Sequence, residues 1–325
     1  MNQAARDESG IESEDGARLR RMIEAIERLF VGKREAVELT VTALLARGHV
    51  LFDDVPGVGK TTLARALSRA LGCRFQRVQF TSDLLPADIV GVSIFDREAG
   101  QFEFRKGPVF TNLLLADEIN RTTPRTQSAL LEAMNEGQVS VDGVTHTLPD
   151  PFMVLATQNP LEFAGTYPLP ESQMDRFLIR VTIGYPSPEV ERTIIESHGF
   201  AGVEATVEPV LSTEEVAAMQ ERTAQTLVAG PVLDYLQRLV AATRDSPYLT
   251  LGVSTRGAIA LHSACQGRAF LHGRDHVLPD DVKALFVAVC AHRVMSKRHH
   301  ESPAERRSVA DAILAEILER TPLAL

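Results

Sequence analysis

The chain has 325 residues, of which 44% are hydrophobic and 24% charged, as in globular proteins that bury large cores, and this length allows two domains. The formal net charge of −9 argues against a function that depends on non-specific attraction to nucleic-acid phosphates, so proteins or small anions are the expected partners. No stretch approaches the roughly 18 apolar residues of a membrane span, and no basic-then-apolar leader opens the chain, so we expect a cytoplasmic protein without a membrane span.

The N-terminal part is predicted to be a tail followed by two helices. Residues 1–17 combine several carboxylates with few side chains to bury, which is typical of a solvated, disordered segment. Apolar residues at helical spacing then predict helices at 19–31 and 36–46. An apolar run at 49–52 predicts the first strand, and a helical pattern follows it at 61–71.

The turn between this strand and helix has the composition of a phosphate-binding loop. Glycine-rich backbone can wrap a polyphosphate with its N–H groups, while Lys60 reaches the β- and γ-phosphates of ATP and Thr61 binds Mg²⁺. Asp54 stands where the strict motif has its first glycine. The alternative interpretation is an ordinary strand–turn–helix connection. The loop residues expected to contact the nucleotide are Val55, Pro56, Gly57, Val58, Gly59, Lys60, Thr61 and Thr62.

A second strand ends in two adjacent carboxylates. The largely apolar run at 110–116 is typical of a strand buried on both faces, and Asp117 and Glu118 follow it directly. We expect Asp117 to contact the cofactor by holding Mg²⁺ together with Thr61, and Glu118 to orient or deprotonate the attacking water. Paired acids after a strand can instead cap a helix, but the presence of Lys60 in the same chain favours the catalytic interpretation.

A third buried strand, at 152–157, is followed by Gln158-Asn159-Pro160. The Asn159 amide is expected to lie beside the γ-phosphate, where it would sense phosphate or position the attacking water. Alternatively, Asn159 bonds to its own turn before the proline. Strand and helix patterns alternate up to about residue 184, which predicts a parallel sheet that is covered by helices on both faces and binds ligands at the carboxyl ends of its strands.

Beyond about residue 208 the strand patterns fade, and helix-start signals predict a small helical bundle. The cysteines are widely spaced in apolar contexts and are expected to be buried free thiols. His146 is expected to be an exposed hairpin residue, and the basic stretch 293–300 a solvated helix end. The aromatic residues within 76–80 and 102–104 are expected to be core. The predicted helices of the bundle begin near Ser212, Pro231, Leu278 and Ser302.

In this order, the motifs resemble the MoxR branch of the AAA+ ATPases over about residues 25–320. The most specific part is the run Ala116-Asp-Glu-Ile-Asn-Arg-Thr-Thr-Pro-Arg-Thr-Gln-Ser-Ala-Leu-Leu-Glu-Ala-Met134. The resemblance implies an α/β fold, with an AAA+ P-loop NTPase core at 18–207 whose parallel sheet is flanked by helices, followed by a small all-α lid domain at 208–325. It also implies hairpin insertions at about 88–104 and 139–148, where local strand patterns surround turns.

The resemblance further implies a homo-oligomeric ring, usually a hexamer, with ATP and Mg²⁺ held between neighbouring subunits. Arg176, in Met-Asp-Arg-Phe, corresponds to the arginine finger that reaches a neighbour's γ-phosphate. Arg256, in Val-Ser-Thr-Arg-Gly-Ala, corresponds to the second sensor arginine, which belongs to the lid. The residues alone leave alternatives open, because Arg176 could pair with Glu171 or Asp175, and Arg256 could be an ordinary helix-start residue. Arg121 could contact a neighbour's nucleotide or form a structural salt bridge.

Similarity to this family implies a chaperone-like ATPase that converts ATP and water to ADP and phosphate in order to remodel, assemble or mature a protein client. In this family, the partner is often a protein that carries a von Willebrand factor A domain. A related nucleic-acid motor is the alternative, but such motors need lysine or arginine on the pore-facing hairpin, and residues 139–148 contain neither, so no nucleic acid is expected. A nucleotide-gated switch with little turnover is a third possibility, and Glu118 argues against it.

Overall fold

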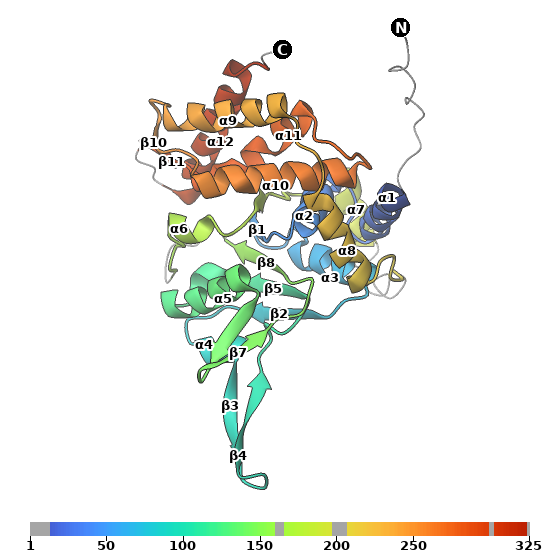
Figure 1. Cartoon of the computed structure of the whole chain (residues 1–325), viewed down its shortest axis with the longest axis vertical. Helices are drawn as coiled ribbons and strands as arrows, with labels where there is room; N and C mark the ends of the chain where they lie inside the picture. Colours follow the sequence, from blue (N-terminus) through green and yellow to red (C-terminus); the bar gives the residue numbers. More distant parts are fainter. Residues whose placement is uncertain (1–13, 160–165, 197–206, 299–301, 324–325) are drawn as a thin grey trace.

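The computed structural model describes residues 14–159, 166–196, 207–298 and 302–323. A hairpin projects from one end of a sheet-centred core, and a group of helices covers the other end (Figure 1). Most of the predicted tail lies outside the described residues, but the tail is shorter than expected because a helix already begins at Glu14. Within the described ranges, no helix combines the length and apolarity needed to cross a membrane.

The core is built on a five-stranded sheet with the order β2-β5-β8-β1-β9. Every adjacent pair is parallel, which confirms the α/β prediction. Gln79 lies opposite Asp117, and Asp53 lies opposite Gln158, so the carboxyl ends of the strands meet along one edge of the sheet. The strands are β1 (Val50–Asp53), β2 (Phe75–Gln79), β5 (Leu113–Asp117), β8 (Met153–Gln158) and β9 (Ile179–Val181).

Alternate residues of the central strands face two separate hydrophobic clusters. Leu113 and Leu115 of β5 belong to a cluster with helices α1, α2 and α3, whereas Leu114 and Ala116 belong to a second cluster with α4 and α5. This period-two alternation is what a strand buried on both faces requires. The helices are α1 (Glu14–Glu27), α2 (Arg34–Leu45), α3 (Lys60–Ala70), α4 (Pro86–Val90) and α5 (Pro124–Glu136).

Two antiparallel hairpins lie where the sequence predicts insertions, and one of them extends away from the body (Figure 1). The expectation that Phe102 belongs to the core is wrong, since it is 71% exposed on the projecting hairpin. His146 is half-buried rather than exposed, because its ring stacks on Phe104 with 4.0 Å between centroids. The hairpins consist of β3 (Gly91–Asp96) with β4 (Gln101–Lys106), and β6 (Gln138–Val141) with β7 (Val144–Thr147).

The described residues after 207 form a mostly helical unit, as predicted, to which one short antiparallel strand pair is added. The predicted capping box is confirmed, because Ser212 Oγ accepts a hydrogen bond from the Glu215 N–H. The elements are α8 (Thr213–Ala224), α9 (Gly230–Arg244), β10 (Leu249–Leu251), α10 (Thr255–Leu271), α11 (Pro279–Cys290), η3 (Ala291–Arg293), β11 (Met295–Ser296) and α12 (Pro303–Arg320).

The basic stretch at 293–300 differs from the expectation of a solvated helix end. Arg293 is only 4% exposed, because its guanidinium lies between the helical unit and the core. His299 and His300 lie outside the described residues. The cysteines are free thiols as predicted, with Cys265 and Cys290 buried, although Cys73 is only half-buried.

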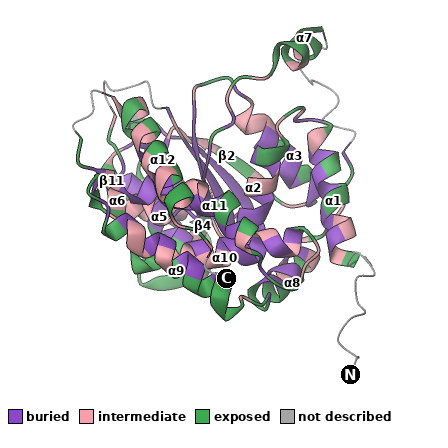
Figure 2. Cartoon of the chain, turned by 90° about the horizontal axis from the view of Figure 1, so that it is seen from above, coloured by how far each residue is buried: buried purple, intermediate pink, exposed green. Residues whose placement is uncertain are grey.

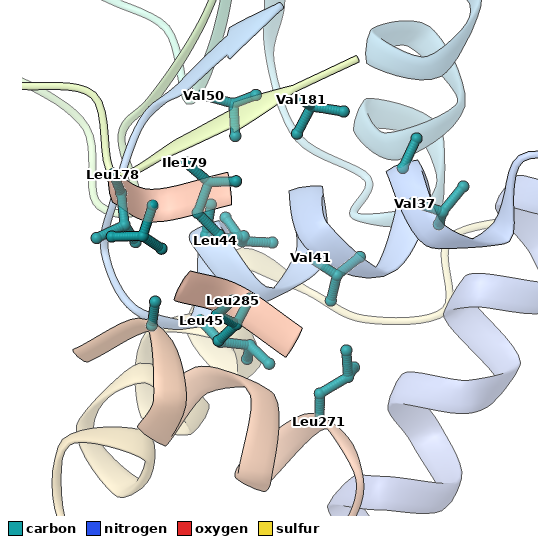
Figure 3. Packing of buried hydrophobic residues seen from close by; sticks show 14 of the residues in the cluster. Val37, Val41, Leu44, Leu45, Val50, Leu178, Ile179, Val181, Leu271 and Leu285 are labelled. Atoms are coloured by element: carbon teal, nitrogen blue, oxygen red, sulfur yellow. The ribbon is translucent and has the colours of Figure 1, made fainter. Parts of the chain in front are cut away.

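Helix α2 joins the helical unit to the sheet. Figure 3 shows Leu44 of α2 near Ile179 of β9, and Leu45 of α2 beside Leu285 of the helical unit. These residues and Leu271 belong to one hydrophobic cluster. The approach is close, because a Cβ at Gly267 of α10 would lie 2.7 Å from the carbonyl oxygen of Thr42. The helical unit and the core therefore share one continuous hydrophobic interior.

The remaining short elements lie at the margins of the core. None of the residues of α7 is buried, and this helix stands at the periphery when the chain is seen from above, whereas β1, β5, β8 and β9 of the five-stranded sheet are mostly buried (Figure 2). The elements are η1 (Ile119–Arg121), α6 (Glu171–Met174) and α7 (Pro188–Glu196).

Candidate functional site

The predicted phosphate-binding loop connects β1 to α3 along the carboxyl edge of the sheet. Gly57 and Gly59 have φ angles of +85° and +97°, a backbone conformation that favours glycine. A Cβ at Gly59 would also lie 2.8 Å from the Phe30 ring. Gly59 caps the N-terminus of α3, whose first N–H groups are therefore directed toward the loop, as anion binding requires.

Lys60 is the first residue of α3 and folds back over the loop. Its Nζ donates hydrogen bonds to the carbonyl oxygens of Asp54 at 2.7 Å and Val55 at 3.0 Å. Burial lowers the pKa of Lys60, while the negative charges of Asp54 and Asp117 act in the opposite direction. The ammonium group thus lies in a partly desolvated position where a phosphate would be an effective counter-charge.

Asp54, the residue that departs from the strict motif, is 6% exposed and has structural partners. One carboxylate oxygen accepts hydrogen bonds from the backbone N–H groups of Ile183 and Gly184, each at 2.6 Å, and the other accepts from the Val55 N–H at 2.8 Å. The carboxylate therefore connects the start of the loop to the segment that leaves β9. The departure from the motif is visible in the sequence, whereas these contacts depend on the fold.

The two predicted carboxylates lie at the end of β5 and are held by the neighbouring strand β8. Thr157 Oγ1 donates to Asp117 Oδ1 at 2.7 Å and accepts from the Glu118 N–H at 2.8 Å. Glu118 has φ +57° and ψ +50°, a left-handed conformation that is uncommon for residues other than glycine and often occurs at functional sites.

Two further side chains on β2 bind these acids. Arg77 donates to Asp117 Oδ2 through Nη2 at 2.6 Å and Nε at 3.1 Å, and Gln79 Nε2 donates to Glu118 Oε2 at 2.6 Å. Arg121 Nη1 also donates to Glu118 Oε2, at 3.0 Å, which agrees with the salt-bridge alternative for this residue. The period-two spacing of 77 and 79 was visible in the sequence, but the pairing of β2 with β5 was not.

A cavity of about 390 Å³ brings the loop and the acids together. Asn159, which follows β8, also lines it, so three separate strand ends contribute to one space. Val55 and Val58 do not line the cavity, because their side chains pack against the hydrophobic cluster below the loop. The lining residues are Pro56, Gly57, Gly59, Lys60, Thr61, Thr62, Arg77, Gln79, Asp117, Glu118, Thr157 and Asn159.

The donor set in this cavity fits Mg²⁺. Thr61 supplies a hydroxyl oxygen and Asp117 a carboxylate oxygen, and these are the oxygen ligands that Mg²⁺ prefers. Among the residues that the structure describes, no group of three or more histidine, cysteine or acidic side chains could hold a metal ion. This is compatible with Mg²⁺, which keeps several waters and needs only one or two protein ligands beside substrate phosphates.

Neither Arg176 nor Arg256 lines the cavity. Arg176 Nη1 donates to the Leu131 carbonyl oxygen at 2.8 Å and borders a separate cavity of about 270 Å³ beside α5. Arg176 does not form the ion pair with Glu171 or Asp175 that the sequence left open as an alternative. Glu171 instead pairs with Arg306, and Asp175 pairs with Arg293. Arg256 is exposed in the first turn of α10.

Comparisons with known proteins agree with this geometry. Residues 49–179 match the family model described as "ATPase family associated with various cellular activities (AAA)", and residues 241–317 match the AAA lid domain. The chain is 48% identical to the uncharacterized protein YeaC of Bacillus subtilis, over 92% of this chain and 93% of that protein. It is 42% identical to the chaperone MoxR1 of Mycobacterium tuberculosis, over 85% of this chain and 75% of that protein.

A solved structure extends the likeness to three dimensions. A candidate ATPase from Cytophaga hutchinsonii superimposes with a TM-score of 0.85 at 34% identity, and the match covers 95% of each chain. Protein MoxR of Methylorubrum extorquens is 30% identical over 91% of this chain and 92% of that protein. With the parallel sheet, the phosphate-binding loop and the helical lid, these likenesses show that the chain belongs to the MoxR family of AAA+ ATPases.

Proposed function

We propose that this protein hydrolyses ATP at the interfaces of a ring-shaped homo-oligomer and uses the reaction to remodel, assemble or mature partner proteins. The observation that carries the proposal is the single cavity in which Lys60 and Thr61 meet Asp117, Glu118 and Asn159. Phosphate binding, metal binding and activation of water each have a suitable side chain there.

In this proposal, the loop N–H groups and Lys60 bind the phosphates, and Thr61 and Asp117 hold Mg²⁺. The metal ion supplies charge stabilisation at the phosphate oxygens when bound. Glu118 accepts a proton from the attacking water, and Asn159 orients that water without adding charge. The hydrogen bond from Gln79 fixes one oxygen of Glu118, so the other is the candidate acceptor for the proton.

Hydrolysis is proposed to require a neighbouring subunit. Arg176 lies outside the cavity of its own chain, as an arginine finger that acts on the next subunit's γ-phosphate would. Arginine fingers in other NTPases contribute about 10³–10⁵ in rate. Arg256, on the lid, is the second proposed phosphate contact. A hexamer is the ring size that the family resemblance implies.

The proposed client is a protein, with a von Willebrand factor A domain protein as a candidate. The β6–β7 hairpin contains no lysine or arginine, and the net charge of −9 disfavours tracking along phosphates. The relative from Mycobacterium tuberculosis is named a chaperone. Salt-dependent binding of DNA or stimulation of turnover by DNA would favour the nucleic-acid motor instead.

The test compares Glu118→Gln, Lys60→Ala and wild-type protein. We expect Glu118→Gln to bind ATP but to lose turnover by about 10²–10⁴, because only the proton acceptor is removed. Lys60→Ala should lose ATP binding as well. Turnover per subunit should rise with protein concentration as rings form, and a wild-type protein that stays monomeric at every concentration yet hydrolyses ATP at its full rate would contradict the proposal.

A further inference from the structure

Asp175, the residue immediately before Arg176, connects three segments that are distant in sequence. Its Oδ1 accepts a hydrogen bond from Arg293 Nε at 2.7 Å, and its Oδ2 accepts from Ser254 Oγ at 3.1 Å. Ser254 is the N-cap of α10, and its Oγ also accepts from the Gly257 N–H at 3.0 Å. One carboxylate thus joins the end of α6 to both η3 and the start of α10.

The partner Arg293 is a buried charge that depends on this carboxylate. Its side chain is 2% exposed, and its guanidinium also donates to the backbone carbonyl oxygens of Leu178, at 3.1 Å, and Phe177, at 2.5 Å. A buried guanidinium is costly unless it is paired and hydrogen-bonded, so Asp175 is the required counter-charge. The same contacts fix the backbone that follows Arg176.

The packing around this junction leaves little freedom. Phe177 is fully buried in the second hydrophobic cluster, and a Cβ at Gly257 would lie 2.9 Å from Arg293 Cδ and 2.7 Å from Val253 Cγ1. The start of α10 therefore lies directly against the arginine that binds Asp175. A displacement of α10 would therefore act on the same arginine that binds Asp175 and the carbonyl oxygens of Phe177 and Leu178.

We propose that Asp175 is a positioning residue that holds Arg176 and the start of α10, which carries Arg256, in a fixed mutual arrangement. The inference rests on the proposed function, in which Arg176 acts on the nucleotide of a neighbouring subunit. A movement of the lid in one subunit is transmitted through Asp175 to Arg176 and from there to the next subunit's site. A misplacement of about 1 Å can cost on the order of 10²-fold in rate, so this junction is able to control turnover.

The test is Asp175→Asn, which preserves the shape of the side chain but removes its charge. Homomeric rings of this variant should still bind ATP and assemble, but turnover should fall by about 10- to 100-fold because Arg176 is misplaced. Mixing Asp175→Asn with Glu118→Gln subunits should restore turnover. In such rings the Asp175→Asn subunits keep every residue that lines the nucleotide cavity, and the Glu118→Gln subunits present a correctly placed Arg176.

Two controls separate this inference from the proposed function. Arg176→Ala mixed with Glu118→Gln tests the finger itself, and a lack of recovery there counts against the proposed function. If that mixture recovers but the Asp175→Asn mixture does not, Asp175 acts on its own subunit and the inference is wrong. Glu171 lies on α6, the short helix that ends just before Asp175, and forms an exposed ion pair with Arg306. Glu171→Gln removes this pair and should leave turnover within about twofold of wild type.

A milder variant keeps the inference testable if Asp175→Asn does not fold. Ser254→Ala removes the link to α10 but leaves the pair of Asp175 and Arg293 in place. Its matched control is Ser212→Ala, which removes an N-cap serine from α8. Turnover should be lower in Ser254→Ala than in Ser212→Ala and should recover on mixing with Glu118→Gln. Equal turnover in the two cap variants, or undiminished turnover in Asp175→Asn rings, overturns the inference.

Discussion

At the scale of single residues, the nucleotide loop shows how a departure from a motif can have a structural cause. Asp54 replaces the first glycine of the motif, and its carboxylate accepts hydrogen bonds from two backbone N–H groups after β9. The glycines that the loop geometry does require, at 57 and 59, are retained. The strict motif is thus altered only where the side chain is directed toward the protein rather than toward the cavity.

We therefore expect Asp54→Gly, which restores the strict motif, to destabilise the protein. The change leaves the buried Ile183 N–H and the half-buried Gly184 N–H without their acceptor, which costs about 1–3 kcal/mol of unfolding free energy. Urea unfolding monitored by circular dichroism measures the effect. Asp234→Ala, at an exposed position of α9, serves as the control and should change the free energy of unfolding by less than about 0.5 kcal/mol.

The candidate site was predictable from sequence where it depends on local order. A loop between a strand and a helix places Lys60 and Thr61, and a buried strand places Asp117 and Glu118 at its polar end. Arg77 and Gln79 were missed because their contacts depend on β2 lying beside β5, which no local pattern determines.

At the scale of elements, His49 links three parts of the core just before β1. Its Nδ1 accepts a hydrogen bond from the Val154 N–H at 3.0 Å, so Nε2 carries the proton and lies 3.0 Å from the carbonyl oxygen of Met134 in α5. This arrangement requires a neutral imidazole, because a proton on Nδ1 would oppose the Val154 N–H. Burial lowers the pKa of His49 to about 4.

Because His49 is buried in its neutral form, we expect the free energy of unfolding to decrease in mild acid. Since the pKa in the folded state lies below the value of about 6.5 in the unfolded chain, the unfolded state binds more protons as the pH falls from 6.5 toward 4. His49 should therefore reduce the free energy of unfolding by about 2 kcal/mol between pH 7 and pH 5. Urea titrations at the two pH values measure it.

The matched comparison is between two histidine variants. His49→Gln should be less stable at pH 7 but should lose most of this part of the pH dependence, whereas His146→Gln on the β6–β7 hairpin should keep it. A pH dependence that is unchanged in His49→Gln would show that other groups, such as the buried His292, whose pKa is also lowered by burial, account for the effect.

The elements themselves were largely predictable, and the errors have identifiable causes. β5 begins at Leu113 rather than 110, because Phe110 lies in a turn in which its N–H bonds to the Gly107 carbonyl oxygen, and the side chains of Thr111 and Asn112 bond to the backbone of Arg74 and Pro151. An apolar residue indicates burial, but buried residues occur in turns as well as in strands, so Phe110 alone could not show where the strand begins. The β10–β11 pair was missed because its strands are only three and two residues long.

At the scale of the whole molecule, the lid and the core share one hydrophobic cluster. The sequence predicts a domain boundary near residue 208, and a single hydrophobic cluster contains residues of α2 and β9 before it and of α10 after it. Composition cannot reveal such sharing, because apolar helix faces look alike whichever element covers them. The burial of Arg293 was missed for the same reason, since its partner Asp175 is 118 positions away in sequence.

Gly267→Ala should test how tightly the two parts are joined. The added Cβ would lie 2.7 Å from the Thr42 carbonyl oxygen, so α10 must move away from α2, and overpacking of this kind costs about 1–3 kcal/mol. Gly230→Ala is the control, because nothing lies within 4 Å of a Cβ there. It should be neutral or slightly stabilising in the same urea titration, and equal effects of the two variants would contradict the close approach.

The shared interior also bears on how the chain can be divided. Gln220 of α8 donates a hydrogen bond to the Leu44 carbonyl oxygen of α2 at 2.6 Å, beside the apolar contacts of the same helix. A fragment that ends before α8 would expose this carbonyl oxygen and the apolar face of α2 to water. Neither half should therefore be obtainable as a well-behaved protein by itself, whereas the two halves produced together in one cell have complementary surfaces through which to reassociate.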